Sequence, residues 1–367
     1  MKILSFHPCP LYTNGGAGRL MRRLCLGKED EVTAMFVKEH CVSTTKGKIR
    51  EIAISAFPKN QKWTRWKLRM LCKWLRENIF FNYTKKRILK KAVETDFDVL
   101  HIINHGVYSA ILCNNEILKN RKLWTSFHDH YSLCSNFCDT NKLWNSSERR
   151  FVISEELGRE YQKIFGNLSY EIITDGLFEN EISQPKTVFE KEIIIYFSGL
   201  LHFDYLPIFK SLADALDCVN DSNITFRFIM RGTQKLDFFR NRNFPVEYRN
   251  DFVSDNEILK ELNSADILYL PIKDNKPAFY MYSLSTKMVG YTGAAGTILY
   301  HGPKESAANR LLEKYDAAVS CFSFDKSDII NSIHMILNNK GQKSSNAKRL
   351  AKEKFNIERT QNIFWQK

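Results

Sequence analysis

The sequence of 367 residues has no apolar run long enough to span a membrane and no cysteine spacing typical of a disulfide framework. Its first residues enter an apolar strand directly, without the segments of a secretory leader. The nine cysteines are scattered along the chain, as expected for free thiols in a reducing compartment. These absences exclude a membrane-spanning or disulfide-stabilised secreted protein and predict a cytoplasmic location.

Acidic residues are scarce in one stretch, between Lys62 and Lys91, where eleven Lys or Arg residues accompany one acid, Glu77. Most of the net charge of +13 is therefore local. On a helix, cations would form one stripe, made of Lys62, Arg65, Arg69, Lys73 and Arg76. Large apolar residues would form the adjacent stripe, made of Trp63, Trp66, Met70 and Trp74.

Three interpretations of this basic segment remain open: a helix lying on an anionic membrane surface, a helix packed on its own domain, and a binder of nucleic-acid phosphates. Tryptophans beside cations are typical of helices at lipid interfaces, so a membrane surface is the favoured partner. Nucleic acid is not expected as a partner.

The chain length and a hydrophobic content of 44% predict two folded α/β domains. Short apolar strands alternate with helical segments, which predicts parallel sheets covered by helices on both faces. The expected strands cover residues 2–6, 32–37, 51–56, 97–103, 122–127, 150–153, 170–173, 193–199, 225–230, 246–249, 265–271 and 297–300. The polar stretch 184–191 is the predicted linker. We therefore expect domains 1–183 and 184–349, followed by a helix in 350–367 that crosses back to the first.

Residues 283–319 combine a polar turn, a helix rich in small residues, a short strand and a second helix. Ser285, Thr286 and Lys287 open the first helix, where free backbone N–H groups and a positive charge favour an anion. The alternative is an ordinary helix–strand connection with a solvated lysine.

A histidine pair follows the expected strand 122–127, at His128 and His130. A zinc site built from these and Cys134 and Cys138 would have a spacing that is not typical of structural zinc, so no metal is predicted. His101 and His105 have no evident partner in the sequence and are expected to be structural.

Several short motifs occur in a fixed order along nearly the whole chain. They are Gly15-Gly16 with Arg19, DVLH at 98–101, His128-Asp129, FVISE at 151–155, ITDG at 173–176, YFSG at 196–199, the block 247–271 ending in ADILYLP, and SLSTKMVGYTGAAG at 283–296. In this order they resemble the GT-B glycosyltransferases, specifically the retaining nucleotide-sugar transferases of bacterial polysaccharide and glycolipid synthesis.

The resemblance implies two Rossmann-like, doubly wound domains facing across a cleft, with the acceptor domain first and the donor domain second. It implies transfer of a sugar from a nucleotide-sugar to a surface polysaccharide or lipid-linked glycan, without a metal and with no cofactor besides the nucleotide-sugar co-substrate. A lipid-linked acceptor would place the enzyme on the inner face of the membrane.

The resemblance also assigns residues to roles. His128 and Asp129 are the catalytic candidates; the alternative for His128 is a loop histidine bonded to the backbone. The donor-binding candidates are Gly15, Gly16, Gly199, Arg231, Ser285, Thr286, Lys287 and Ser306. For Arg231 the alternative is an ion pair on a loop, and for the glycine pair a plain turn. The acceptor or membrane candidates are Arg19 and, from the separate argument on the basic segment, Lys62, Trp63, Arg65, Trp66, Arg69 and Trp74.

Two features depart from the family pattern. The paired glutamates that hold the donor are replaced by Tyr282 and Gly290, and no basic residue follows the turn at Gly199. Neutralisation of the phosphates then falls to Lys287, to Arg231 or to the helix start near Ser306. A GT-B sugar-nucleotide epimerase and a catalytically impaired scaffold remain alternatives.

Overall fold

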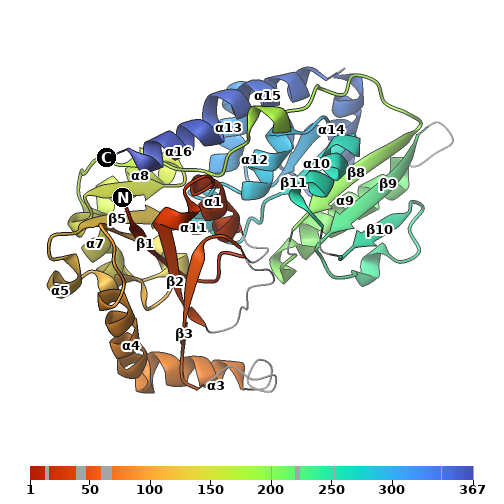
Figure 1. Ribbon diagram of the computed structural model, residues 1–367. Helices are drawn as coiled ribbons and strands as arrows, with labels where there is room; N and C mark the ends of the chain where they lie inside the picture. Colours follow the sequence, from red (N-terminus) through yellow and green to blue (C-terminus); the bar gives the residue numbers. More distant parts are fainter. Residues whose placement is uncertain are drawn as a thin grey trace. The chain divides into compact units, whose positions relative to one another are not determined.

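The chain forms two compact units, each built on one parallel sheet (Figure 1). The computed structural model describes residues 1–12, 16–38, 47–58, 68–199, 201–219, 224–251, 253–339 and 341–366. Unit 1 comprises 1–175 and 359–367, and unit 2 comprises 176–358. Within the described residues, no helix has the length and apolar character needed to cross a membrane.

Unit 1 contains a seven-stranded sheet in the order β3-β2-β1-β4-β5-β6-β7, with every neighbouring pair parallel. Its strands are β1 (Ile3–His7), β2 (Val32–Lys38), β3 (Arg50–Ser55), β4 (Val99–Ile103), β5 (Lys122–Phe127), β6 (Arg149–Val152) and β7 (Glu171–Ile172). β1 and β4 are buried along their whole length because both faces of the sheet are covered.

The described helices in the first 175 residues of unit 1 are α1 (Gly16–Leu24), α3 (Arg69–Trp74), α4 (Phe81–Val93), α5 (Asn115–Leu118), α6 (Tyr131–Cys134), α7 (Phe137–Ser146) and α8 (Glu155–Phe165). Short 3₁₀ turns η1 (Glu29–Glu31) and η3 (Ser109–Leu112) and the π-helical turn η2 (Leu75–Ile79) complete them. α8 starts where the Ser154 hydroxyl caps the helix by accepting from the Leu157 amide.

Unit 2 contains a six-stranded parallel sheet in the order β10-β9-β8-β11-β12-β13. Its strands are β8 (Glu192–Ser198), β9 (Thr225–Arg231), β10 (Val246–Arg249), β11 (Ile267–Pro271), β12 (Thr297–His301) and β13 (Ala318–Cys321). Both sheets start in the middle and grow outward to either side, so the doubly wound prediction is confirmed.

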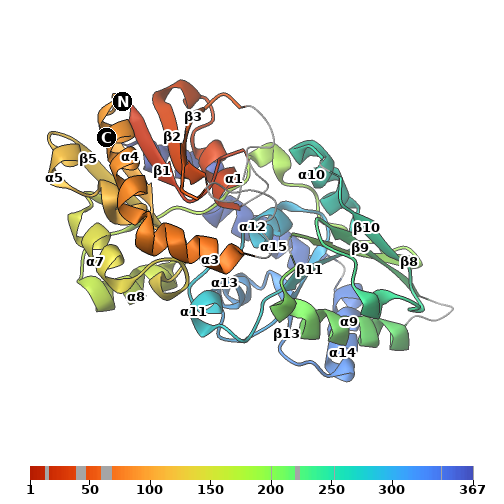
Figure 2. The ribbon, with the colours of Figure 1, turned by 90° about the horizontal axis from the view of Figure 1, so that it is seen from below.

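The helices of unit 2 are α9 (Leu206–Val219), α10 (Asp255–Ser264), α11 (Pro277–Tyr280), α12 (Thr286–Gly293), α13 (Ala307–Tyr315), α14 (Lys326–Asn338) and α15 (Gln342–Lys354), with 3₁₀ turns η4 (Glu179–Glu181), η5 (Phe203–Tyr205) and η6 (Asp237–Phe239). One core cluster joins α9 and α14 to one face of the sheet. A second joins α10, α12, α13 and α15 to the other face. Figure 2 shows α9 and α14 side by side.

The division between the units falls at Asp175, earlier than the predicted linker. Leu177 already belongs to unit 2, since its amide donates to the Phe355 carbonyl and Ile357 donates back to its own. The same bonds interrupt the single helix expected over residues 350–365. The chain instead forms α15, which ends at Lys354, and α16 (Ile357–Trp365).

The chain returns to unit 1 within α16. Gln361 and the indole of Trp365 donate to the carbonyls of Arg23 and Leu24 in α1. The Phe364 ring packs on the rings of β4–β6, 5.3 Å from His101, 5.6 Å from Trp124 and 5.5 Å from Phe151. Both chain ends lie near one another in the two views (Figures 1 and 2).

Candidate functional site

The start of α12 in unit 2 has the features of an anion-binding helix terminus. Ser285 occupies the N-cap position but makes no side-chain cap bond. In the described chain, no partner accepts from the backbone amides of Thr286 and Lys287. By contrast, Ser254 caps α10 and Ser306 caps α13. The N–H groups at the start of α12 are therefore available to a ligand.

Lys287 stands in this first turn with no acidic partner among the described residues. Its ammonium lies 4.2 Å from the centre of the Phe197 ring. Burial lowers the pKa of Lys287 to about 8. A partly buried cation without a carboxylate is costly for the fold, and an anionic ligand would reduce that cost.

The absence of a side chain at Gly199 leaves space for the Lys287 side chain. The φ of Gly199 is +131°, a backbone conformation that side chains with a Cβ rarely adopt. A Cβ at this position would also lie 3.1 Å from both Cε and Nζ of Lys287. The glycine turn after β8 and the helix start at Lys287 thus form one small cationic site, the α12 site, at the carboxyl end of β8.

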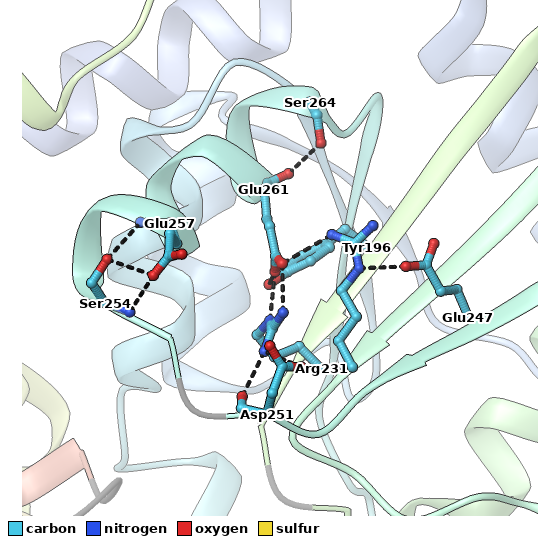
Figure 3. A network of polar contacts seen from close by, with 9 residues as sticks. Tyr196, Arg231, Glu247, Asp251, Ser254, Glu257, Glu261 and Ser264 are labelled. Carbon is cyan, nitrogen blue, oxygen red and sulfur yellow. Dashed lines mark hydrogen bonds and ion pairs between the residues drawn. The ribbon is translucent and has the colours of Figure 1, made fainter.

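Arg231 ends β9 and is already paired within the protein (Figure 3). Its Nε and Nη2 each donate to Glu261 at 2.6 Å, and its Nη1 donates to the Asp251 carbonyl at 2.9 Å. The same carboxylate accepts from the Tyr196 hydroxyl at 2.8 Å and pairs with Arg249 at 2.9 Å. With these bonds made, Arg231 has the ion-pair role that was its alternative interpretation.

This network borders a cavity of about 580 Å³. Its lining is mostly charged and consists of Arg231, Glu247, Tyr248, Arg249, Asp251, Val253, Glu257, Lys260 and Glu261. Ser306, another donor candidate, is fully buried. Its hydroxyl accepts from the Asn309 amide and bonds to the Tyr300 hydroxyl at 2.6 Å, so it is engaged within unit 2.

The two positions expected for the family's glutamates remain without carboxylates. Tyr282 lies just before α12 and Gly290 lies within it. A Cβ added at Gly290 would have the Leu262 side chain as its nearest neighbour, at 3.9 Å. A Cβ would therefore fit at this position without a clash.

In unit 1, the catalytic candidates His128 and Asp129 directly follow the carboxyl end of β5. Burial lowers the pKa of His128 to about 4, with Asp129 opposing that shift and His105 adding to it. His128 is consequently neutral at pH 7 and can accept a proton or a hydrogen bond. The Asp129 carbonyl accepts from the Tyr161 hydroxyl at 3.1 Å, which ties this loop to α8.

The His/Cys run that follows has local structural roles. His130 caps α6 by accepting from the Ser132 amide, and the Cys134 thiol lies within bonding distance of three backbone carbonyls. Across the described ranges, no group of three or more His, Cys, Asp or Glu residues is placed to hold a metal ion.

Arg19 of α1, a candidate for acceptor contact, forms an ion pair with Asp175 instead of projecting freely. Its Nε lies 2.9 Å from Asp175, whose carboxylate is fully buried. Gly16 begins α1, whereas Gly15 lies outside the described residues.

The described part of the basic segment begins at residue 68, so Lys62, Trp63, Arg65 and Trp66 lie outside it; Arg69 opens α3. Met70 is 76% exposed and Trp74 is 52% exposed, and Leu71 and Ile79 are exposed as well. Figure 1 shows α3 at the lower end of unit 1, below β3. Arg76 departs from the expected cationic stripe, because it is buried and donates to the Pro58 carbonyl at 2.9 Å.

Sequence reasoning missed two groups. Glu261 was not singled out, because a glutamate in an amphipathic helix gives no sign of facing inward. His7 was also missed, although its place at the end of β1, directly before Pro8, marks the carboxyl edge of the sheet.

No protein-family model matches the chain, and no curated protein matches it significantly. Solved structures do match it along its whole length. The N-terminal domain of trehalose-6-phosphate phosphatase from Candida albicans has a TM-score of 0.69 at 11% identity, covering 99% of this chain and 95% of that one. Sucrose-phosphate synthase from Thermosynechococcus elongatus has 0.69 at 11%, covering 99% and 97%.

HepE from Anabaena, solved in complex with UDP and glucose, has a TM-score of 0.67 at 14% identity, covering 99% of this chain and 98% of that one. The chain has the GT-B fold. The fold predicted from the ordered motifs is thereby confirmed, and at these identities the likeness concerns the fold alone.

Proposed function

We propose that this protein is a glycosyltransferase that moves a sugar from a nucleotide-sugar to a glycan acceptor. The α12 site would hold the diphosphate of the donor, with Lys287, Ser285, Thr286 and the turn at Gly199. The leaving diphosphate gains negative charge as the glycosidic bond breaks. A fixed cation and aligned N–H groups stabilise that charge.

The observation that carries this proposal is a partly buried lysine that has no acidic partner among the described residues and lies beside an uncapped helix start. Protein interiors rarely keep a cation without a counter-charge unless a ligand supplies one. The likeness to HepE, whose structure contains UDP and glucose, supports a nucleotide-sugar as that ligand. His128 and Asp129, at the carboxyl edge of the other sheet, are the proposed contacts to the reacting sugar.

Thermal unfolding with a panel of UDP, GDP and CMP tests the donor site. We expect one of the nucleoside diphosphates, UDP or GDP, to raise the Tm by about 5 °C or more at roughly 100 times its Kd. Binding at that level adds about 2.7 kcal/mol of stability. Free nucleotide released from the matching nucleotide-sugar in the presence of acceptor would then establish transfer.

The panel also separates the alternatives. An epimerase would convert the nucleotide-sugar without releasing nucleotide and without needing an acceptor. A catalytically impaired scaffold would bind no nucleotide productively. If no nucleotide shifts the Tm, the transferase proposal is wrong.

A polysaccharide or lipid-linked acceptor on an anionic membrane is the finer part of the proposal. Its support is the exposed face of α3 and η2, where Met70, Leu71, Trp74 and Ile79 leave large apolar side chains in water beside Lys73. Such surfaces are characteristic of lipid or protein contacts. The surrounding cations favour an anionic lipid surface over a basic or neutral one.

Flotation with vesicles tests this surface. Replacing Met70, Leu71 and Trp74 together by serine should weaken binding to phosphatidylglycerol vesicles about tenfold or more, because the inserted apolar area is lost. Val188 and Met335, which are 75% and 58% exposed in unit 2, provide matched serine controls that should bind as the wild type does. Unchanged binding by the triple variant would refute the membrane contact.

A further inference from the structure

A continuous chain of buried hydrogen bonds crosses the sheet of unit 1 from β5 to β1. The Ser126 hydroxyl lies 2.7 Å from Nε2 of His101. Nδ1 of His101 lies 2.7 Å from the Ser5 hydroxyl, which is in turn 2.7 Å from Nε2 of His7. All four side chains are at most 2% exposed.

These residues share one face of the sheet. Side chains alternate along a strand, so Ser5 and His7 point to the same side of β1, and Ser5 is in register with His101 on β4. The Phe364 ring of α16 lies 5.3 Å from the His101 ring, which shows that α16 covers this face. His101, expected to be structural, is thus the centre of a polar chain that ends at the carboxyl edge.

Counting the protons on these side chains fixes the direction of each hydrogen bond in the series. Burial lowers the pKa of both His7 and His101, so each ring is neutral and carries one N–H. In the described chain, His101 is the one partner of the Ser126 hydroxyl. If His101 donated to Ser126, the buried Ser126 O–H would have no acceptor, which is unfavourable.

The arrangement in which every buried donor has an acceptor therefore starts at Ser126. Its O–H donates to Nε2 of His101, Nδ1–H of His101 donates to Ser5, and the Ser5 O–H donates to Nε2 of His7. The proton of His7 then sits on Nδ1. Among the described residues none bonds to this nitrogen, so its N–H is available to a ligand.

We propose that His7 is a substrate-binding residue that donates Nδ1–H to a sugar hydroxyl, and that Ser5, His101 and Ser126 are positioning residues that fix this tautomer. The proposal rests on the proposed glycosyltransferase function. His7 is close enough to His128 for each charge to disfavour the other, which places it beside the catalytic candidates. A neutral N–H donor suits an uncharged hydroxyl better than a phosphate.

The tautomer of His7 can be read directly from long-range ¹H–¹⁵N spectra of histidine-labelled protein, with the His7→Asn variant assigning the signal. We expect the Nδ1–H form in the wild type. Inorganic phosphate should leave this signal unmoved, and UDP-glucose, as a nucleotide-sugar probe, should shift it. A response to phosphate equal to that with UDP-glucose would overturn the sugar assignment.

Two serine substitutions test the positioning role. Ser126→Ala removes the hydroxyl that starts the chain and should give a mixture of His7 tautomers, with kcat/KM lowered about fivefold or more. Ser147→Ala is the matched control, because it removes a buried hydroxyl bonded at 2.7 Å to the neighbouring Thr125 without touching the histidines. It should leave both readouts as in the wild type.

Conservative replacements of His7 give a second readout. The amide nitrogen of His7→Asn can occupy the place of Nδ1, whereas that of His7→Gln falls nearer Nε2. We expect the asparagine variant to retain more kcat/KM than the glutamine variant by about tenfold. Equal losses would contradict a donor at Nδ1.

The failure of this proposal is distinguishable from failure of the proposed function. An Nε2–H tautomer in the wild type, or identical behaviour of Ser126→Ala and Ser147→Ala, overturns the histidine chain even where sugar transfer is established. Absence of transfer in the wild type overturns the function, and the spectra still decide the tautomer.

Discussion

Replacing Lys287 by methionine should lower kcat for sugar transfer by about 10²–10³-fold, as removal of one fixed electrostatic donor at a developing negative charge generally does. Methionine retains the length and apolar contacts of the lysine stem above Phe197. The variant should fold as well as the wild type, because it removes a cation that has no acidic partner in the described chain. Steady-state kinetics with the nucleotide-sugar identified by the panel measure the effect.

Lys326 provides the matched control for this substitution. It also lies in the first turn of a unit 2 helix, α14, but it is exposed. Lys326→Met should leave kcat unchanged. Equal activities of the two variants would contradict a role for Lys287 at the diphosphate.

The pH dependence follows from the lowered pKa of Lys287, about 8 in the free protein. Nucleotide affinity should weaken as the pH rises above about 8, since the cation is lost, and Lys287→Arg should bind with little change there. The free energy of unfolding has the opposite pH dependence to nucleotide affinity. The folded pKa lies below the unfolded value of about 10.4, so the wild type gains stability relative to Lys287→Met between these two pKa values.

Replacing Glu261 by alanine should lower the free energy of unfolding of unit 2 by about 3–5 kcal/mol, because it leaves a buried arginine without its counter-charge. The side chains of Arg231 and Glu261 are only 9% and 15% exposed. Asp251 is the control, since it contacts the same arginine but is 71% exposed, and Asp251→Ala should cost less than about 1 kcal/mol.

Urea unfolding can resolve this effect by unit. All six tryptophans fall in unit 1, so their fluorescence follows that unit, while far-UV circular dichroism follows both. Glu261→Ala should move only the dichroism transition. A double variant, Arg231→Met with Glu261→Leu, should recover most of the loss, and failure to recover it would mean that the network has a function beyond packing.

Unfolding at low pH should also test the network around Glu261. Burial works to raise the pKa of Glu261, but hydrogen bonds from Arg231, Tyr196 and Arg249 keep it below its usual value. The stability from this carboxylate is therefore present above the unfolded pKa of about 4.3 and is lost as the pH falls below it. Glu261→Gln should show a flatter stability profile in that range.

The sequence by itself determined the alternation of strands and helices, because that pattern depends on local periodicity and caps. The strand 122–127 and the strand 246–249 have their predicted bounds. The helix start at Lys287 was also predicted, since hydroxyls and a lysine before a run of small residues are a local signal. The final helix was predicted as one, because the hydrogen bonds between Leu177 and residues 355–357 that divide it connect positions far apart in the chain.

Only the tertiary structure decided which polar side chains are already engaged. The sequence predicts Arg231 as a phosphate-binding residue, but in the structure it pairs with Glu261, 30 residues away. His101 reads as an isolated residue, yet Ser5 and Ser126 bond to it from neighbouring strands. A sequence shows which groups a chain carries, but the satisfaction of each buried donor depends on neighbours that parallel strand pairing brings together from distant positions.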